Sequence, residues 1–88
     1  MNWIVYIIMC SDNTLYTGIS NDIEKRFKDH QNGNGAKYFR GRKPEELVYV
    51  EEGHSRSTAS KRELEIKKMT RTKKDQLIKS SNEELKVG

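Results

Sequence analysis

Two tyrosines near the amino terminus, Tyr6 and Tyr16, are the first candidates for chemistry in this 88-residue chain. They stand ten residues apart, in segments that predict the paired strands of a short hairpin. Arg26 and His30 follow on a predicted helix, four residues apart, so they stack on one side of it. A later predicted helix carries the carboxylate of Glu63. Phenols, a guanidinium, an imidazole and one carboxylate are groups that a phosphodiester-cleaving site would need.

Each of these residues also has a structural interpretation. A phenol with a pKa near 10 is a poor base at neutral pH, unless positive charge from Arg26, His30 or a metal ion lowers that pKa. Hairpin tyrosines are usually packing residues, and a histidine on an apolar helix face is usually a satisfied structural residue. Glu63 could pair with Arg62, Lys67 or the hairpin. Its functional alternative is Mg²⁺ binding, because this ion takes one or two protein carboxylates and keeps several waters.

A shared site for the two phenols requires an odd-numbered hairpin loop or a bulge. Directly paired residues of an antiparallel hairpin lie on the same face of the sheet. A two- or four-residue turn would therefore place Tyr6 and Tyr16 on opposite faces, whereas an odd loop such as residues 12–14 places them together. Gly18, inside the predicted return strand, indicates a bulge or the close approach of another group.

The order of elements predicts one α+β domain over residues 1–80, followed by a polar tail at 81–88 that frays. The first strand is apolar on both alternating faces, which is typical of the middle strand of a sheet covered by helices on each side. The expected strands are 3–10, 15–20 and 47–50. The first expected helix begins after a cap at Asn21 and ends at 32–33. The second covers 57–69, and the third begins at Thr70 or Thr72 and continues through Ile78.

The charge distribution is compatible with a polyanionic partner. The net charge is +4 with a pI of about 9.3. Basic residues gather in two stretches: Lys37, Arg40, Arg42 and Lys43, then Lys67, Lys68, Arg71, Lys73 and Lys74. Most such stretches are simply solvated surface, but two of them favour nucleic acid as a partner.

The compartment is predicted from cysteine usage and from the apolar segments. The single cysteine, Cys10, excludes an internal disulfide and favours a reducing compartment. The apolar run at residues 3–9 is too short to span a bilayer. We therefore expect a cytoplasmic protein without a membrane partner.

Val5-Tyr6-Ile7 and Tyr16-Thr17-Gly18 resemble the two halves of the GIY-YIG nuclease motif, and Arg26, His30 and Glu63 follow at suitable distances. The stretches 33–38 and 41–44, and Glu63 ahead of residues 66–68, resemble the small stand-alone bacterial members of that family. The likeness extends from residue 3 to residue 79. Both tyrosines and the second glycine of the motif are present, while the spacer positions differ.

The resemblance implies a central three-stranded antiparallel sheet flanked by helices, and an endonuclease that uses one divalent ion, Mg²⁺ or Mn²⁺. By position, Tyr6 would activate or orient the attacking water, and Tyr16 would hydrogen-bond the water or the scissile phosphate. Arg26 would stabilise charge at phosphorus and His30 would support the base. Glu63 would hold the ion.

The resemblance also implies a role for Gly18, which would keep the hairpin open beside the substrate. The substrate would be DNA, and the candidate nucleic-acid-binding residues are Lys37, Arg40, Arg42 and Lys43. Family members with defined biology usually carry a further DNA-binding or partner domain, so a protein partner could supply specificity here. Two alternatives remain: a non-catalytic nucleic-acid-binding module with the same fold and basic surface, and a protein-interaction domain whose basic clusters only increase solubility.

Overall fold

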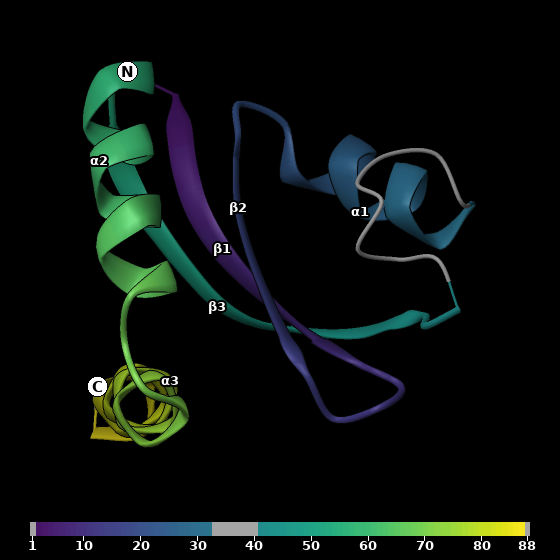
Figure 1. Cartoon of the computed structure of the whole chain (residues 1–88). Helices are drawn as coiled ribbons and strands as arrows, with labels where there is room; N and C mark the ends of the chain where they lie inside the picture. Colours follow the sequence, from purple (N-terminus) through teal and green to yellow (C-terminus); the bar gives the residue numbers. More distant parts are fainter. Residues whose placement is uncertain (1, 33–40, 88) are drawn as a thin grey trace.

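The apolar strand β1 (Trp3–Cys10) forms the middle of a three-stranded antiparallel sheet with the order β2-β1-β3 (Figure 1). The computed structural model describes residues 2–32 and 41–87. Strands β2 (Leu15–Ser20) and β3 (Pro44–His54) lie on either side of β1. Val5 and Ile7 on one face of β1, and Ile8 on the other, are fully buried. Burial on both faces explains the continuous apolar sequence of this strand and confirms the predicted fold class.

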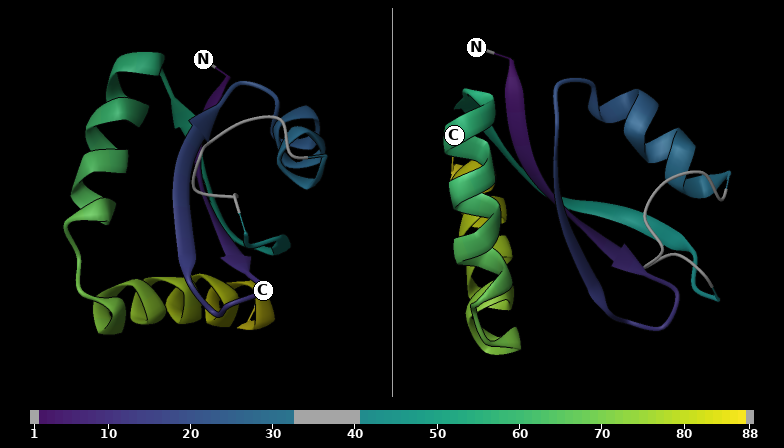
Figure 2. Two further views of the ribbon diagram at one scale, coloured as in Figure 1. Left: turned by 45° about the vertical axis from the view of Figure 1, so that its right-hand side comes forward. Right: turned by 45° about the horizontal axis from the view of Figure 1, so that its top comes forward.

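The helices cover the two faces of the sheet separately. Helix α1 (Ile23–Gln31) lies on one face, while α2 (Arg56–Lys67) and α3 (Arg71–Val87) lie on the other, with α3 running across the end of α2 (Figure 2). The core is accordingly divided: Tyr6 and Ile8 pack with α1, and Val5 and Ile7 pack with α2 and α3. No helix within the described ranges is long and apolar enough to cross a membrane.

The third strand is longer than predicted. The expected strand covered residues 47–50, but β3 extends from Pro44 to His54 and pairs with β1 along its whole length. An edge strand can carry charged residues because part of its surface faces water, and proline is tolerated at its first position. Irregularities in the pairing accompany the extension, and Gly53 near the end of β3 adopts a φ of 81°.

Helix α1 is capped by a different residue from the predicted one. Asp22, rather than Asn21, caps α1, and its side chain accepts a hydrogen bond from the backbone N–H of Lys25. Ser20 accepts a hydrogen bond from the N–H of Asp22, which holds Asp22 at the cap position.

The tail predicted to fray at 81–88 is helical as far as Val87. That stretch contains neither proline nor glycine before its last residue, so nothing interrupts the helix.

The hairpin has the odd-numbered loop that a shared site requires. Tyr6 pairs with Gly18 and Ile8 pairs with Tyr16, so the loop comprises residues 11–13 rather than 12–14. Asn13 completes the turn with a φ of 66°, a conformation that three-residue hairpin loops use at their last position and that asparagine tolerates. Tyr6 and Tyr16 consequently lie on the same face of the sheet, as the hypothesis demanded.

Candidate active site

Tyr6 lies at the centre of the sheet face that α1 covers. Its side chain is 1% exposed, although a phenol carries a polar hydroxyl. That hydroxyl lies 3.1 Å from Nε2 of His30, in a hydrogen bond between the middle strand and the last turn of α1. The ring centroid of Tyr16 is 6.3 Å from that of Tyr6 and 5.4 Å from the imidazole. The structure thus brings together the two phenols and the histidine that the sequence singled out.

Gly18 makes room for this arrangement. It lies opposite Tyr6 in the sheet, and a Cβ atom added to it would be 2.6 Å from the Tyr6 hydroxyl oxygen and 3.1 Å from the Tyr16 ring. The close approach indicated by the sequence is therefore that of the Tyr6 side chain itself. The resemblance had assigned Gly18 to keep the hairpin open beside the substrate, and that role stays a prediction.

We expect Gly18→Ala to destabilise the protein by about 1–3 kcal/mol, the usual cost of overpacking a filled core. The added methyl group must displace the Tyr6 ring and so disturb its bond to His30. Denaturant unfolding measures the first effect, and the ¹⁵N signals of the His30 imidazole measure the second. Gly53→Ala is the control, because it strains the backbone where nothing lies within 4 Å of the new Cβ. Unchanged His30 signals in Gly18→Ala would contradict the prediction.

His30 is buried between the helix and the hairpin. It falls on the inward side of α1 together with Ile23 and Phe27, the two apolar residues that pack on the Tyr6 side of the core. Burial lowers the pKa of its imidazole, and the nearby positive charge of Arg26 lowers it further, against a smaller opposing effect of Asp29. His30 is therefore neutral at neutral pH, which leaves one ring nitrogen able to accept a proton.

A neutral buried histidine makes stability depend on pH. The unfolded chain recovers the ordinary histidine pKa of about 6.5, and it binds a proton before the folded chain does. The contribution of His30 is thus present above about pH 6.5 and is lost as the pH falls through the lower folded pKa. Denaturant titrations between about pH 5 and 8 should show this decline. The decline should vanish in His30→Gln and persist in His54→Gln; a decline that His30→Gln leaves intact would argue against the assignment.

Burial dominates the ionisation of the phenols. It raises the pKa of Tyr6 well above the ordinary value, Tyr16 and Glu63 raise it further, and Arg26 opposes the rise. The pKa of Tyr16 is also raised, first by burial and then by Glu63, again against Arg26. Arg26 acts in the direction expected from the sequence, but burial outweighs it. Both residues are therefore protonated phenols at neutral pH.

Arg26 lies at the exposed rim of the site. It stands one turn before His30 on α1, and its charge acts on both phenols and on the imidazole. It lines a small surface pocket with two polar residues, a lysine and two aspartates: Ser20, Asn21, Lys25, Asp22 and Asp29. Within the described part of the chain its guanidinium forms no ion pair with a carboxylate. A free guanidinium at the rim of such a pocket can bind a phosphate oxygen.

Glu63, on helix α2, acts on the same two phenols through its negative charge. Its side chain is 21% exposed and pairs with Lys67, one turn later, at 3.4 Å. Among residues 2–32 and 41–87, no three His, Cys, Asp or Glu side chains gather in a way that could hold a metal ion. A single carboxylate nevertheless suits Mg²⁺ or Mn²⁺, which accept a site completed by waters and substrate phosphate. It does not suit Zn²⁺, which takes three or four protein ligands.

The predicted nucleic-acid-binding residues are only partly described. Lys37 and Arg40 lie outside the described residues. Arg42 is half-buried, and its Nε lies 3.1 Å from the carboxylate of Asp12 in the hairpin loop. Lys43 is exposed, and its backbone N–H and C=O bind Ser11 of the same loop. Arg42 and Lys43 therefore hold the start of β3 against the hairpin, and Lys43 leaves its ammonium in solvent.

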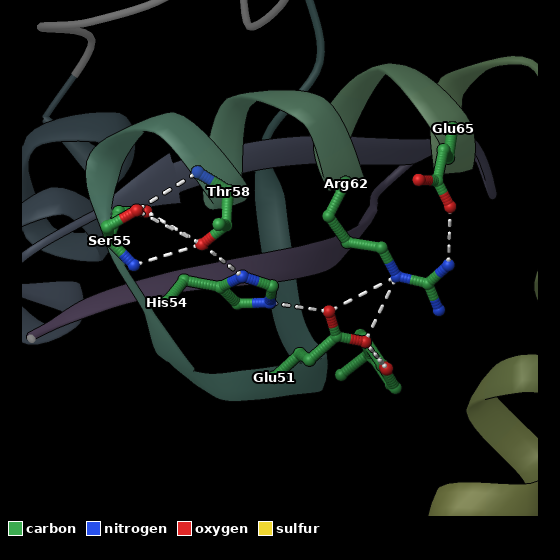
Figure 3. Close-up of polar contacts among 7 residues, drawn as sticks. Glu51, His54, Ser55, Thr58, Arg62 and Glu65 are labelled. Carbon is green, nitrogen blue, oxygen red and sulfur yellow. Dashed lines mark hydrogen bonds and ion pairs between the residues drawn. The ribbon is translucent and has the colours of Figure 1, made fainter.

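A polar network between β3 and α2 was not predicted from the sequence (Figure 3). The carboxylate of Glu51 accepts hydrogen bonds from Tyr49 at 2.6 Å and from Arg62 Nε at 3.1 and 3.2 Å, and its other contact is with His54 Nε2 at 2.7 Å. The residues of this network lie on the sheet face that α2 covers, away from Tyr6. No local pattern reveals a pairing between residues eleven positions apart on different elements.

Comparison with known proteins shows what this chain is similar to. Residues 2–76 match the model of the GIY-YIG catalytic domain. A UPF0213 protein of Clostridium perfringens is 54% identical, over 93% of this chain and 87% of the relative. A UPF0213 protein of Natronomonas pharaonis is 50% identical, over 84% of this chain and 87% of the relative.

Two solved structures share the fold. The solution NMR structure of a UPF0213 protein from Bacillus halodurans is 44% identical and superposes with a TM-score of 0.57, covering 90% of this chain and 84% of that one. The solution NMR structure of a protein from E. faecalis is 36% identical with a TM-score of 0.62 and the same two coverages, 90% and 84%.

Proposed function

We propose that this chain, which belongs to the GIY-YIG domain family and within it to the UPF0213 proteins, is an endonuclease. It would hydrolyse DNA phosphodiester bonds with the help of one divalent ion, Mg²⁺ or Mn²⁺. The observation that supports this most directly is the buried hydrogen bond between the Tyr6 hydroxyl and Nε2 of His30. A phenol bonded to a neutral imidazole forms a two-step path for a proton.

The proton path explains how a phenol with a raised pKa can act as a base. As a water oxygen bonds to phosphorus, its proton passes to the Tyr6 oxygen while the Tyr6 proton passes to Nε2 of His30. Tyr6 therefore never has to exist as a free phenolate. The path requires the His30 tautomer that carries its proton on Nδ1, so that Nε2 accepts. The bond from phosphorus to the leaving oxygen breaks in the same displacement.

The remaining residues stabilise and place the phosphate. Arg26, exposed at the rim, would neutralise charge that develops on the phosphate oxygens. Tyr16 would hydrogen-bond the water or the phosphate from the neighbouring strand. Glu63 would hold the divalent ion, which supplies Lewis-acid stabilisation of the leaving oxygen when bound.

DNA is the proposed substrate because the domain is basic. The net charge is +4, and the exposed ammonium groups of Lys43, Lys67, Lys68 and Lys73 can contact a phosphate backbone. Lys37, Arg40 and Arg42 stay proposed contacts to the nucleic acid on the basis of the sequence. A protein partner would supply specificity, and the proposed compartment is the cytoplasm, where a single free cysteine such as Cys10 stays reduced.

The test is a Mg²⁺ titration of the purified protein against duplex, branched and single-stranded DNA. Cleavage of at least one substrate should increase with Mg²⁺ to a plateau and stop when EDTA is added. Binding, measured separately in EDTA, should weaken by about 0.9 log unit per log unit of salt for each phosphate neutralised. Salt-dependent binding without cleavage of any substrate would instead support a non-catalytic nucleic-acid-binding module. Absence of binding would support a protein-interaction domain.

A further inference from the structure

Helix α2 is held to the sheet by few apolar contacts. Of its twelve residues, only Ala59 and Ile66 are buried, and Leu64 is 56% exposed. A small alanine and one isoleucine, two turns apart, fix the line of contact with the sheet. Ala59 and Ile66 only weakly oppose rotation of the helix about its own axis, because neither side chain extends to either side of that line.

The two residues beside this line are Arg62 and Glu63. At 3.6 residues per turn, each residue advances about 100° around the helix. Arg62 and Glu63 therefore lie about 50° to either side of the line through Ala59 and Ile66. Rotation of α2 in either direction moves one of the two toward the sheet and the other away from it. The position of Arg62 consequently determines the direction in which Glu63 points.

The Arg62 side is anchored to β3. Its Nε lies 3.1 and 3.2 Å from the two carboxylate oxygens of Glu51. Tyr49 and His54, which precede and follow Glu51 on the same strand, contact that carboxylate as well. Thr58, on the first turns of α2, contacts Nδ1 of His54 at 3.0 Å and so ties a second point of the helix to the network (Figure 3).

The carboxylate of Glu51 is committed to these contacts. Burial by itself would raise its pKa, but the hydrogen bonds from Tyr49 and His54, and the charge and hydrogen bond of Arg62, outweigh burial and hold that pKa below its usual range. Both of its oxygens accept from neighbours. Glu51 is therefore an ionised anchor and has no free lone pair directed at a substrate.

We infer that the Glu51–Arg62 pair is a positioning device, which sets the rotation of α2 and so the direction in which Glu63 points. The inference rests on the proposed role of Glu63 as the ligand of the divalent ion. Arg62 and Glu51 touch neither phenol, so they act on the site only through the helix. A role in stability alone would leave the orientation of α2 unchanged in any variant that still folds.

The experiment compares Arg62→Met with Glu65→Gln at a temperature well below the melting transition of both. Glu65 pairs with the same arginine at 3.1 Å, but its side chain is 63% exposed, so its loss leaves the contact with Glu51 in place. Residual dipolar couplings of the amides of 56–67 report the orientation of α2. Line broadening by Mn²⁺ reports metal binding near Glu63. Neither measurement depends on cleavage.

We expect Arg62→Met to change the α2 couplings and to weaken Mn²⁺ binding by about tenfold, the lower end of the effect of losing a residue that orients a metal ligand. Glu65→Gln should match the wild type in both measurements. Glu51→Gln keeps the size of the side chain, and it replaces Arg62→Met as the test variant if Arg62→Met does not fold. In a Glu63→Gln background, Arg62→Met should weaken Mn²⁺ binding no further.

Two failures can be told apart. Wild-type couplings in folded Arg62→Met and Glu51→Gln would overturn the inference, whether or not Mn²⁺ binds. The second failure combines changed couplings in the variants with Mn²⁺ broadening in the wild type that is not centred on Glu63. This result would overturn the proposed metal role of Glu63, and with it the function that we assign to the positioning.

Discussion

Glu63→Gln is expected to reduce Mg²⁺-dependent DNA cleavage by about 10³-fold while leaving DNA affinity nearly unchanged. A bound divalent ion contributes several kcal/mol to the stabilisation of transition-state charge, and each 1.4 kcal/mol corresponds to a factor of ten in rate. Glutamine has the same size as glutamate but lacks the charge that holds a hard cation. The side chain is 21% exposed and pairs with the half-exposed Lys67 one turn later, and i,i+4 pairs on a helix contribute only about 0.3–0.5 kcal/mol to stability.

Single-turnover cleavage at saturating DNA separates this loss from a loss of binding. Glu65→Gln is the matched control, since it makes the same chemical change two residues further along α2 on an exposed side chain. That control should cleave at the wild-type rate. If Glu63→Gln cleaves as fast as Glu65→Gln across the Mg²⁺ titration, Glu63 is not the metal ligand.

Tyr6→Phe is expected to lower the cleavage rate by about 10²–10⁴-fold, the usual contribution of a positioned general base. The change removes one hydroxyl and keeps the ring that packs over Gly18. The folded structure should therefore persist, and thermal unfolding would verify that it does. The loss should appear in the rate of the bound complex and not in the affinity for DNA, because the hydroxyl is bonded to His30 in the protein interior.

A double-substitution cycle tests whether Tyr6 and His30 form one proton path. If they do, Tyr6→Phe combined with His30→Gln should cost scarcely more than Tyr6→Phe alone, because residues that act as a unit show strongly non-additive effects. Fully additive losses would mean that the two side chains contribute separately. Cleavage by Tyr6→Phe at the wild-type rate would remove Tyr6 from the mechanism.

Much of the fold was predictable because its signals are local. The bounds of β1 and β2 match the predicted ones, since an apolar run and a polar turn delimit them. The requirement for an odd loop followed from the alternation of side chains in a strand, and the register of Tyr6 with Gly18 satisfies it. The length of β3 was not predictable, because its charged residues pair with β1 only once the edge of the sheet exists. The helical continuation of α3 to Val87 was not predicted from the sequence, and the fraying of this polar end stays a prediction.

The sequence named the residues of the candidate site, but it did not predict how deeply those residues are buried or how burial shifts their pKa values. Tyr6, Tyr16, Arg26, His30 and Glu63 were identified by their order and by the resemblance to the GIY-YIG motif. The structure brings Tyr6, Tyr16 and His30 together, and Arg26 and Glu63 act on the phenols through their charges. The roles of these residues stay predictions. The direction of the phenol pKa shifts required the structure, because burial and not neighbouring charge dominates them. The network around Glu51 likewise had no sequence signal.

The amino-acid sequence by itself therefore determined the type and order of the elements, the candidate residues and the condition that Tyr6 and Tyr16 share a face. The elements and the shared-face condition follow from periodicity and turn chemistry, which act over a few neighbouring residues. The candidate residues follow from their order in the sequence and from the resemblance to the GIY-YIG motif. The tertiary structure alone decided that Gly18 accommodates the Tyr6 ring, that His30 is buried against the Tyr6 hydroxyl, and that Glu63 acts on the phenols from α2. Those properties depend on which distant segments exclude water from one another, and exclusion of water is what shifts a buried group's pKa.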